Sequence, residues 1–267
     1  MGFYDRDFRS QDFTVHVDGE EVPCRLFSPP PEKLAPEPLL YLSCANTIEL
    51  SLRSYPYCVA VEVMLEQGHR VVSFDPPHHG SRSGSVHGAE IPGMRAAFLA
   101  GADPFRRFVR EGQAVIDRCI SLGAAEPGRI VIGGVSRSGY MSLRLYAEEP
   151  RIAALAAFCP VTDWRVIGFT EERDRADVAA LRLSTWAEQL AGKPMMIIVP
   201  NHDWAVSTEC CLQFYLDVQQ ANEEAGHGKR HVDLIVTDEV YHTCSGSWYA
   251  KAAEFLIRRA LPVRRNG

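Results

Sequence analysis

Several features that would mark a special class of protein are missing from this sequence. Its 267 residues contain no internal repeat, no low-complexity tract and no linker in the middle of the chain, which favours one large domain over 1–267. No apolar run reaches the about 18 residues needed to cross a bilayer, so we expect no membrane partner. The formal net charge is −6, which argues against nucleic acid as a partner.

The N-terminal segment MGFYDRDFRSQDF lacks the basic and apolar regions of a secretory signal. We therefore expect a cytoplasmic protein, the alternative being that a signal preceded this segment and was removed. None of the eight cysteines forms a C-x-x-C pair, and most lie among apolar residues. Buried free thiols in a reducing compartment are expected, with a disulfide or a reactive thiol, above all at Cys244, as the alternative.

What the sequence does contain is a regular alternation of short apolar strands and helices. Strands near 13–17 and 22–27, joined at Asp18-Gly19, predict an N-terminal antiparallel hairpin. The alternation that follows predicts an α/β fold, with a mostly parallel sheet of about eight strands and helices on both faces. The later strands are predicted at 39–43, 70–74, 129–132, 152–158, 195–199 and 232–236, and the helices at 57–68, 105–122, 139–148, 178–190, 208–224 and 247–260.

A long connection over 81–104 contains four glycines and interrupts this alternation. Long ordered loops in compact domains are often functional. The connection therefore either covers the active site or is plain decoration of the fold.

Functional groups of parallel sheets collect beyond the carboxyl ends of the strands, and the first candidate follows the strand at 129–132. The segment GGVSRSG places Ser136 at the apex of a strand–turn–helix, which would expose its hydroxyl and point the next amides at one spot. The segment nearly matches G-x-S-x-G, with Ser138 in place of the last glycine. Taken alone, it fits a nucleophile and a glycine-rich structural turn equally well.

Asp203 and His242 follow two further predicted strands. Asp203 could be a helix N-cap, but Ser207 can cap that helix by itself. His242 lies between the last strand and the last helix, in a loop where a lone histidine is usually structural. A serine, an aspartate and a histidine beyond three separate strands nevertheless favour a nucleophile, a base and an acid that orients the base.

These segments make the chain resemble the α/β-hydrolase superfamily, whose catalytic residues follow the order serine, acid, histidine. Within it, the chain is similar to single-domain esterases of the dienelactone-hydrolase and prolyl-oligopeptidase-like types over roughly residues 12–260. The likeness is carried by GGVSRSG, HDWAV, VYHTC and VVSFDPPHHGSRSG, the last of which matches a D-x-P-G-H-G turn, and CPVTDW at 159–164 is also shared.

The resemblance implies a mechanism through an acyl-enzyme, with Ser136 as nucleophile, His242 as base and Asp203 as its partner. No metal or organic cofactor is required. The implied oxyanion hole consists of the backbone amide of Arg137 and a second amide just past the strand at 39–43.

The second oxyanion-hole amide is assigned to Ala45, with Asn46 as the alternative, because YLSCAN lacks the H-G-G of many relatives. Asn46, Trp204 and Trp164 are expected to contact the substrate, although packing explains the two tryptophans equally well.

Three histidines, His78, His79 and His87, invite a metal-site hypothesis. His79 belongs to the D-x-P-G-H-G turn, which is structural in relatives. We therefore expect these residues to hold no metal.

The expected function is that of a serine esterase acting on a small or medium ester, as a monomer or a homo-oligomer. A peptidase is the rival within the same chemistry, although the larger relatives that cut peptides carry a propeller domain for which this chain has no room. The alternative from another class is a catalytically silent hydrolase fold that acts as a ligand receptor. The presence of all three triad residue types argues against that alternative.

Overall fold

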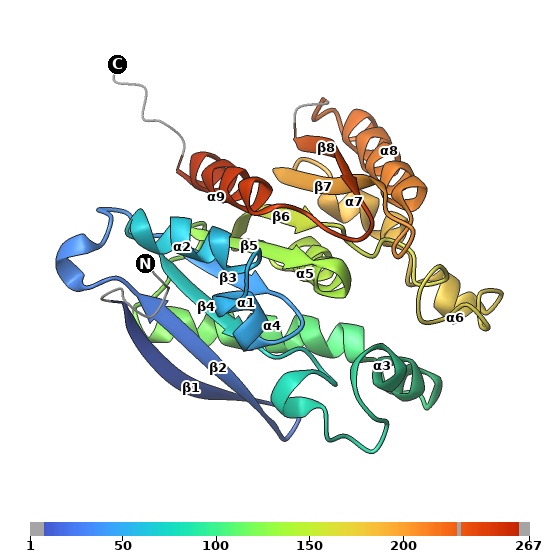
Figure 1. Ribbon diagram of the computed structural model, residues 1–267, viewed down its shortest axis with the longest axis horizontal. Coiled ribbons are helices and arrows are strands. Elements are labelled where there is room, and N and C mark those ends of the chain that lie inside the picture. The colour runs from blue at the N-terminus through green and yellow to red at the C-terminus, as the bar shows by residue number, and fades with distance from the viewer. Residues whose placement is uncertain (1–7, 229–230, 262–267) are drawn as a thin grey trace.

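An eight-stranded sheet runs through the middle of the protein, with helices on both sides (Figure 1). The computed structural model describes residues 8–228 and 231–261. The strands are β1 (Arg9–Val17), β2 (Glu20–Ser28), β3 (Leu40–Cys44), β4 (Arg70–Phe74), β5 (Ile130–Val135), β6 (Ile152–Phe158), β7 (Met195–His202) and β8 (Val232–Val240). Their order across the sheet is β1-β2-β4-β3-β5-β6-β7-β8.

The pairing of the strands confirms the predicted α/β fold. Strands β4, β3, β5, β6, β7 and β8 are mutually parallel, whereas β1 and β2 form an antiparallel hairpin that joins the sheet beside β4. Asp18 and Gly19 connect the hairpin with φ angles of 52° and 80°. Two consecutive positive φ angles match the right-handed twist of the flanking strands, which is why Asp-Gly is favoured there.

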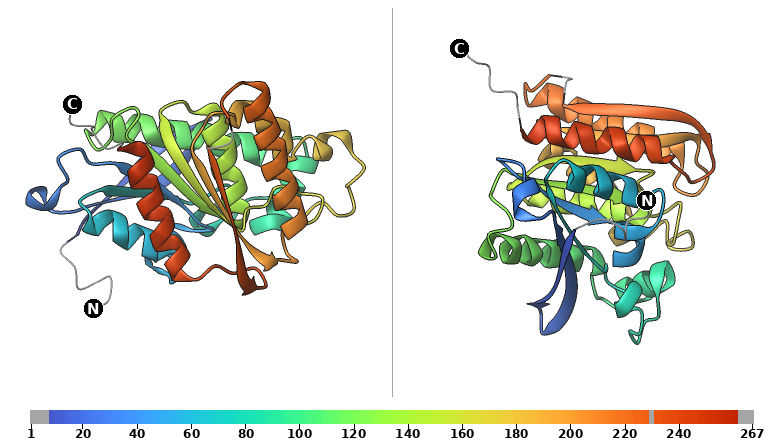
Figure 2. Two further views of the ribbon diagram at one scale, coloured as in Figure 1. Left: turned by 90° about the horizontal axis from the view of Figure 1, so that it is seen from above. Right: turned by 60° about the vertical axis from the view of Figure 1, so that its left-hand side comes forward.

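Helices cover both faces of the sheet. Figure 2 shows α2 and α9 together on one face, with α4, α5 and α8 on the other. The α-helices are α1 (Ile48–Arg53), α2 (Cys58–Glu66), α3 (Glu90–Leu99), α4 (Pro104–Ser121), α5 (Ser136–Glu148), α6 (Ala176–Ala179), α7 (Ala187–Leu190), α8 (Thr208–Glu224) and α9 (Gly246–Ala260), and 3₁₀ helices cover Pro31–Lys33, Gly80–Arg82 and Leu183–Trp186.

The prediction of one continuous helix over 178–190 is wrong. The chain instead forms α6, the 3₁₀ helix Leu183–Trp186 and α7, because Arg182 is extended with a ψ of 133°. The amide of Leu183 donates to the carbonyl of Thr162, and the Leu183 side chain is fully buried. A tertiary hydrogen bond and burial thus override the local helical pattern.

The sequence pattern also missed two helices. Helix α1 is only six residues long, and α3, inside the 81–104 connection, contains Pro92 and Gly93 in its first turns. Short segments and helix breakers give weak periodic signals.

Because β5, β6, β7 and β8 are neighbours and parallel, their carboxyl ends meet at one edge of the sheet. In the residues that the structure describes, no helix combines the length and apolarity needed to span a bilayer. Residues 1–7, part of the segment in which we expect no signal, lie outside the described residues.

Candidate active site

Ser136 stands at a sharp junction between β5 and α5. It is the first residue of α5, directly after the last residue of β5, and its φ angle is 55°. The junction is crowded: a Cβ atom on Gly134 would lie 2.5 Å from the carbonyl oxygen of Ser138, and one on Gly139 would lie 3.1 Å from Pro160. A non-glycine residue held at positive φ between close neighbours is a feature that clusters at functional sites.

Asp203 lies just past β7 and is buried, with 2% of its surface exposed. Its Oδ1 atom accepts hydrogen bonds from the amides of Ala205 and Val206, at 3.0 and 3.2 Å. Ser207 caps α8 by accepting from the Cys210 amide. The carboxylate is therefore not the helix cap, and its Oδ2 atom is available to another partner.

That partner is His242, in the loop after β8. Its Nδ1 atom lies 2.8 Å from Oδ2 of Asp203. An ionised carboxylate only accepts hydrogen bonds, so Nδ1 carries the proton and Nε2 presents a lone pair. In the described part of the chain, the Ser136 hydroxyl forms no hydrogen bond.

The loop after β3 is fastened to the start of α5 by two side chains. Ser138 Oγ donates to the carbonyl of Ala45 at 2.8 Å, and Arg137 Nε donates to Oδ1 of Asn46 at 3.1 Å. The structure thus brings Ala45, Asn46 and Arg137 together. The carbonyl and the next amide of a trans peptide point in opposite directions, so the Asn46 N–H points away from Ser138.

The connection 81–104 reaches this group through α3. Glu90, the first residue of α3, accepts a hydrogen bond from Nη2 of Arg137 at 3.3 Å. The Arg137 side chain is only 11% exposed, and burial lowers its pKa. This contact joins residues 47 positions apart, so no local pattern in the sequence could have revealed it.

The aromatic residues expected to contact a substrate differ in position. Trp164 is fully buried and packs on Phe105 and Tyr140, which is an arrangement of the core and offers no surface to a substrate. Trp204, next to Asp203, is 76% exposed. Tyr241, next to His242, is 65% exposed and was not anticipated, because only its adjacency to His242 sets it apart in the sequence.

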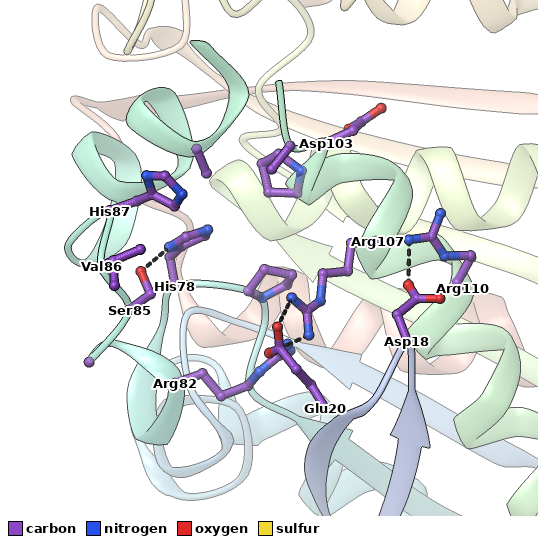
Figure 3. Close-up of a pocket in the computed structure, with 15 residues that line it drawn as sticks. Asp18, Glu20, His78, Arg82, Ser85, Val86, His87, Asp103, Arg107 and Arg110 are labelled. Atoms are coloured by element: carbon purple, nitrogen blue, oxygen red, sulfur yellow. Dashed lines mark hydrogen bonds and ion pairs between the residues drawn. The ribbon is translucent and has the colours of Figure 1, made fainter. Parts of the chain in front are cut away.

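A cavity of about 630 Å³ lies elsewhere, between the β1–β2 hairpin, residues 77–87 and the start of α4. Figure 3 shows Arg107 and Arg110 paired with Glu20 and Asp18 across it. Neither Ser136, Asp203 nor His242 lines this cavity. Its volume alone therefore does not make it the reaction site, and the strand ends remain the better candidate because Ser136 and the Asp203–His242 pair lie there.

The three histidines suspected of metal binding do not converge. His79 is buried and its Nδ1 atom bonds to the carbonyl of Pro77, and burial lowers its pKa to about 4. His78 bonds instead to Ser85. Among the described residues, the His, Cys, Asp and Glu side chains that do converge are Cys159, Asp203 and His242, with one donor atom of each within 4.8 Å of the others.

No protein-family model and no curated protein matches this chain. Solved structures do. A cold-adapted esterase from an Arctic intertidal metagenomic library matches with a TM-score of 0.68 at 18% identity, over 94% of both chains. The Pyrococcus furiosus esterase Pf2001 matches with a TM-score of 0.69 at 16% identity, over 97% of this chain and 95% of that one.

A larger protein gives a partial match. The Pyrococcus horikoshii acylaminoacyl peptidase matches with a TM-score of 0.69 at 16% identity, over 98% of this chain but 43% of its own. Together with the strand order and the N-terminal hairpin, these likenesses identify the chain as a protein of the α/β-hydrolase fold.

Proposed function

We propose that this protein is a serine hydrolase that cleaves carboxylic esters of small or medium size. The observation that carries the proposal is the 2.8 Å hydrogen bond between His242 Nδ1 and the buried Asp203 carboxylate. It lies at the same sheet edge as the junction that exposes Ser136. An acid, a base and a serine hydroxyl at one edge are the parts that acyl transfer needs.

In the proposed reaction, His242 Nε2 removes the proton of the Ser136 hydroxyl as the oxygen attacks the ester carbonyl. Asp203 holds the imidazole in the tautomer that leaves Nε2 free, and it stabilises the imidazolium that forms. His242 then gives the proton to the leaving alcohol. Water, activated by the same imidazole, releases the acyl group from Ser136.

The tetrahedral intermediate needs donors for its oxyanion, and we assign these to the backbone amides of Arg137 and Asn46. Arg137 follows the nucleophile at the start of α5, where helix amides have no partner within the helix. From the sequence, Ala45 is the first choice; we prefer its alternative Asn46, because the Asn46 N–H belongs to the peptide whose carbonyl Ser138 holds, and that bond limits how this N–H can turn. Each such donor typically contributes about 3–4 kcal/mol to transition-state stabilisation.

A fluorophosphonate probe and a panel of chromogenic esters test this function. We expect covalent labelling of the native protein at Ser136, read by peptide mass spectrometry, and turnover of short acyl esters. Heat-denatured protein is the control and should not be labelled. Labelling at Ser138 would show that another hydroxyl is the nucleophile, and an absence of both labelling and turnover would favour the ligand-receptor alternative. Appreciable cleavage of aminoacyl amides, which are intrinsically less reactive than esters, would favour the peptidase.

Ser138→Ala should lower kcat for a good ester substrate about tenfold while leaving KM nearly unchanged. The variant removes the donor to the Ala45 carbonyl, so the Asn46 amide is held less firmly, and a donor that acts on the transition state affects kcat. Ser142→Ala is the matched control, since Ser142 is equally buried in α5 and forms no hydrogen bond to the loop after β3 within the described residues. Equal rates for both variants would contradict the role of Ser138.

A further inference from the structure

Two buried thiols lie beside the Asp203–His242 pair and have no part in the proposed reaction. Cys159 follows β6 directly, and its Sγ lies 3.2 Å from Sγ of Cys244, which is two residues after His242. Both cysteines are free and buried. One donor atom from each of Cys159, Asp203 and His242 lies within 4.8 Å of the other two, the one group of this kind in the part of the chain that the structure describes.

We infer that this cluster is an inhibitory binding site for a thiophilic divalent cation such as Zn²⁺, with Cys159, Asp203 and His242 as its protein ligands. Thiolate, imidazole and carboxylate are the ligand types that Zn²⁺ takes in proteins. The cation would sit between His242 and Asp203, in the place of the Nδ1 proton. It is an inhibitor rather than a cofactor, so a reaction that needs no metal remains expected.

The separation of the nitrogen and oxygen ligands is close to the one that the ion requires. Tetrahedral zinc with bonds of about 2.0–2.3 Å separates its nitrogen, oxygen and sulfur ligands by about 3.3–3.6 Å. The Nδ1–Oδ2 distance of 2.8 Å would therefore open by roughly half an ångström. Asp203 keeps its bonds from the Ala205 and Val206 amides through Oδ1, which hold the ligating carboxylate in orientation.

Binding exchanges protons for the ion. In the metal-free protein, a hydrogen bond with Cys244, together with burial, holds the pKa of Cys159 well above its usual range. A thiol that binds a metal loses its proton to solvent. Nδ1 of His242 must present a lone pair to the ion, so its proton moves to Nε2.

The new tautomer explains why the ion would inhibit. An imidazole with its N–H at Nε2 has no lone pair there and cannot accept the proton of Ser136. The ion-bound protein would therefore be inactive although its nucleophile is intact. This consequence rests on the proposed function, whereas the binding itself does not. The His242 side chain is 29% exposed, so one ligand of the site is in contact with solvent.

Cobalt(II) is the probe for the site, because thiolate–cobalt bonds give a charge-transfer band in the near ultraviolet. The reduced, chelator-treated full chain is titrated with cobalt chloride. We expect a band that saturates at about one equivalent and is displaced by Zn²⁺. Cys159→Ala should weaken cobalt binding by about 100-fold or more, because losing even an outer partner of a ligand costs about 10–100-fold. Cys119→Ala, which removes a buried thiol of α4, should bind as the parent protein does.

Ser136→Ala separates the site from the function. This variant keeps all the proposed ligands, so its cobalt spectrum should equal that of the parent protein. The absence of a charge-transfer band in the parent protein, or an unchanged band in Cys159→Ala, would overturn the site. Ester turnover of the parent protein should fall at the Zn²⁺ concentrations that displace cobalt and return on chelation, and insensitive turnover would overturn the inhibition. A normal cobalt spectrum in a protein with no turnover and no fluorophosphonate labelling would leave the site standing and remove the proposed function.

Discussion

Ser136→Ala is expected to lower kcat for a short-chain ester about a millionfold, leaving only the roughly 10³–10⁴-fold advantage over the solvent reaction that oxyanion-hole donors and substrate binding supply. Alanine removes the only atom that forms the acyl-enzyme, and His242 and Asp203 cannot act without it, because the members of a triad work as a unit. The measurement is single-substrate kinetics at pH 7, with thermal unfolding as the test of folding. Serine already adopts a φ of 55° at position 136. Alanine also has a Cβ atom, so the substitution adds no new backbone strain.

Ser142→Ala again serves as the control for the loss of a hydroxyl from α5. Removal of a nucleophile leaves far less than about a hundredth of the parent rate. If Ser136→Ala kept more than that, the reaction would not proceed through this hydroxyl.

Asp203→Asn is expected to lower kcat about 10⁴-fold. The amides of Ala205 and Val206 both donate to one oxygen of the side chain, so the asparagine would keep its oxygen there. Its NH₂ group would then face His242 Nδ1 and donate to it. That hydrogen bond stabilises the tautomer with the proton on Nε2, which cannot serve as the base.

The control is Glu209→Gln, which neutralises an exposed carboxylate at the start of the same helix α8. It should change kcat less than twofold, a value typical of exposed substitutions away from a site. A loss in Asp203→Asn as small as that of Glu209→Gln would mean that the carboxylate does not act through His242.

The sequence predicted the strands well because their apolar runs are continuous and flanked by turn residues. Strands β4 and β6 have the predicted ends, and the segments that carry Ser136, Asp203 and His242 lie past the strands where they were expected. Such patterns involve only residues that are close in the sequence, so they can be recognised from one sequence alone. The position of Trp164 was harder to predict, because a tryptophan after a strand can line a pocket or fill the core. Only the packed structure distinguishes these two positions.

What the sequence could not provide were contacts between distant segments. The bond from Ser138 to Ala45 joins residues 93 positions apart, and Cys159 meets Cys244 across 85 positions. Likewise, the break in the predicted helix at 178–190 depends on a hydrogen bond to Thr162. These features arise from tertiary packing, which overrides local propensity.

The two bonds between the start of α5 and the loop after β3 have a consequence for the energetics of the reaction. Ser138 holds Ala45 and Arg137 holds Asn46, so the two proposed oxyanion donors belong to one rigid unit. Dipoles that are already aligned need not turn as charge develops on the substrate, whereas water dipoles must. Solvent dipoles would have to reorient at each turnover, at a cost in free energy. In this protein the donors are oriented once, when the chain folds.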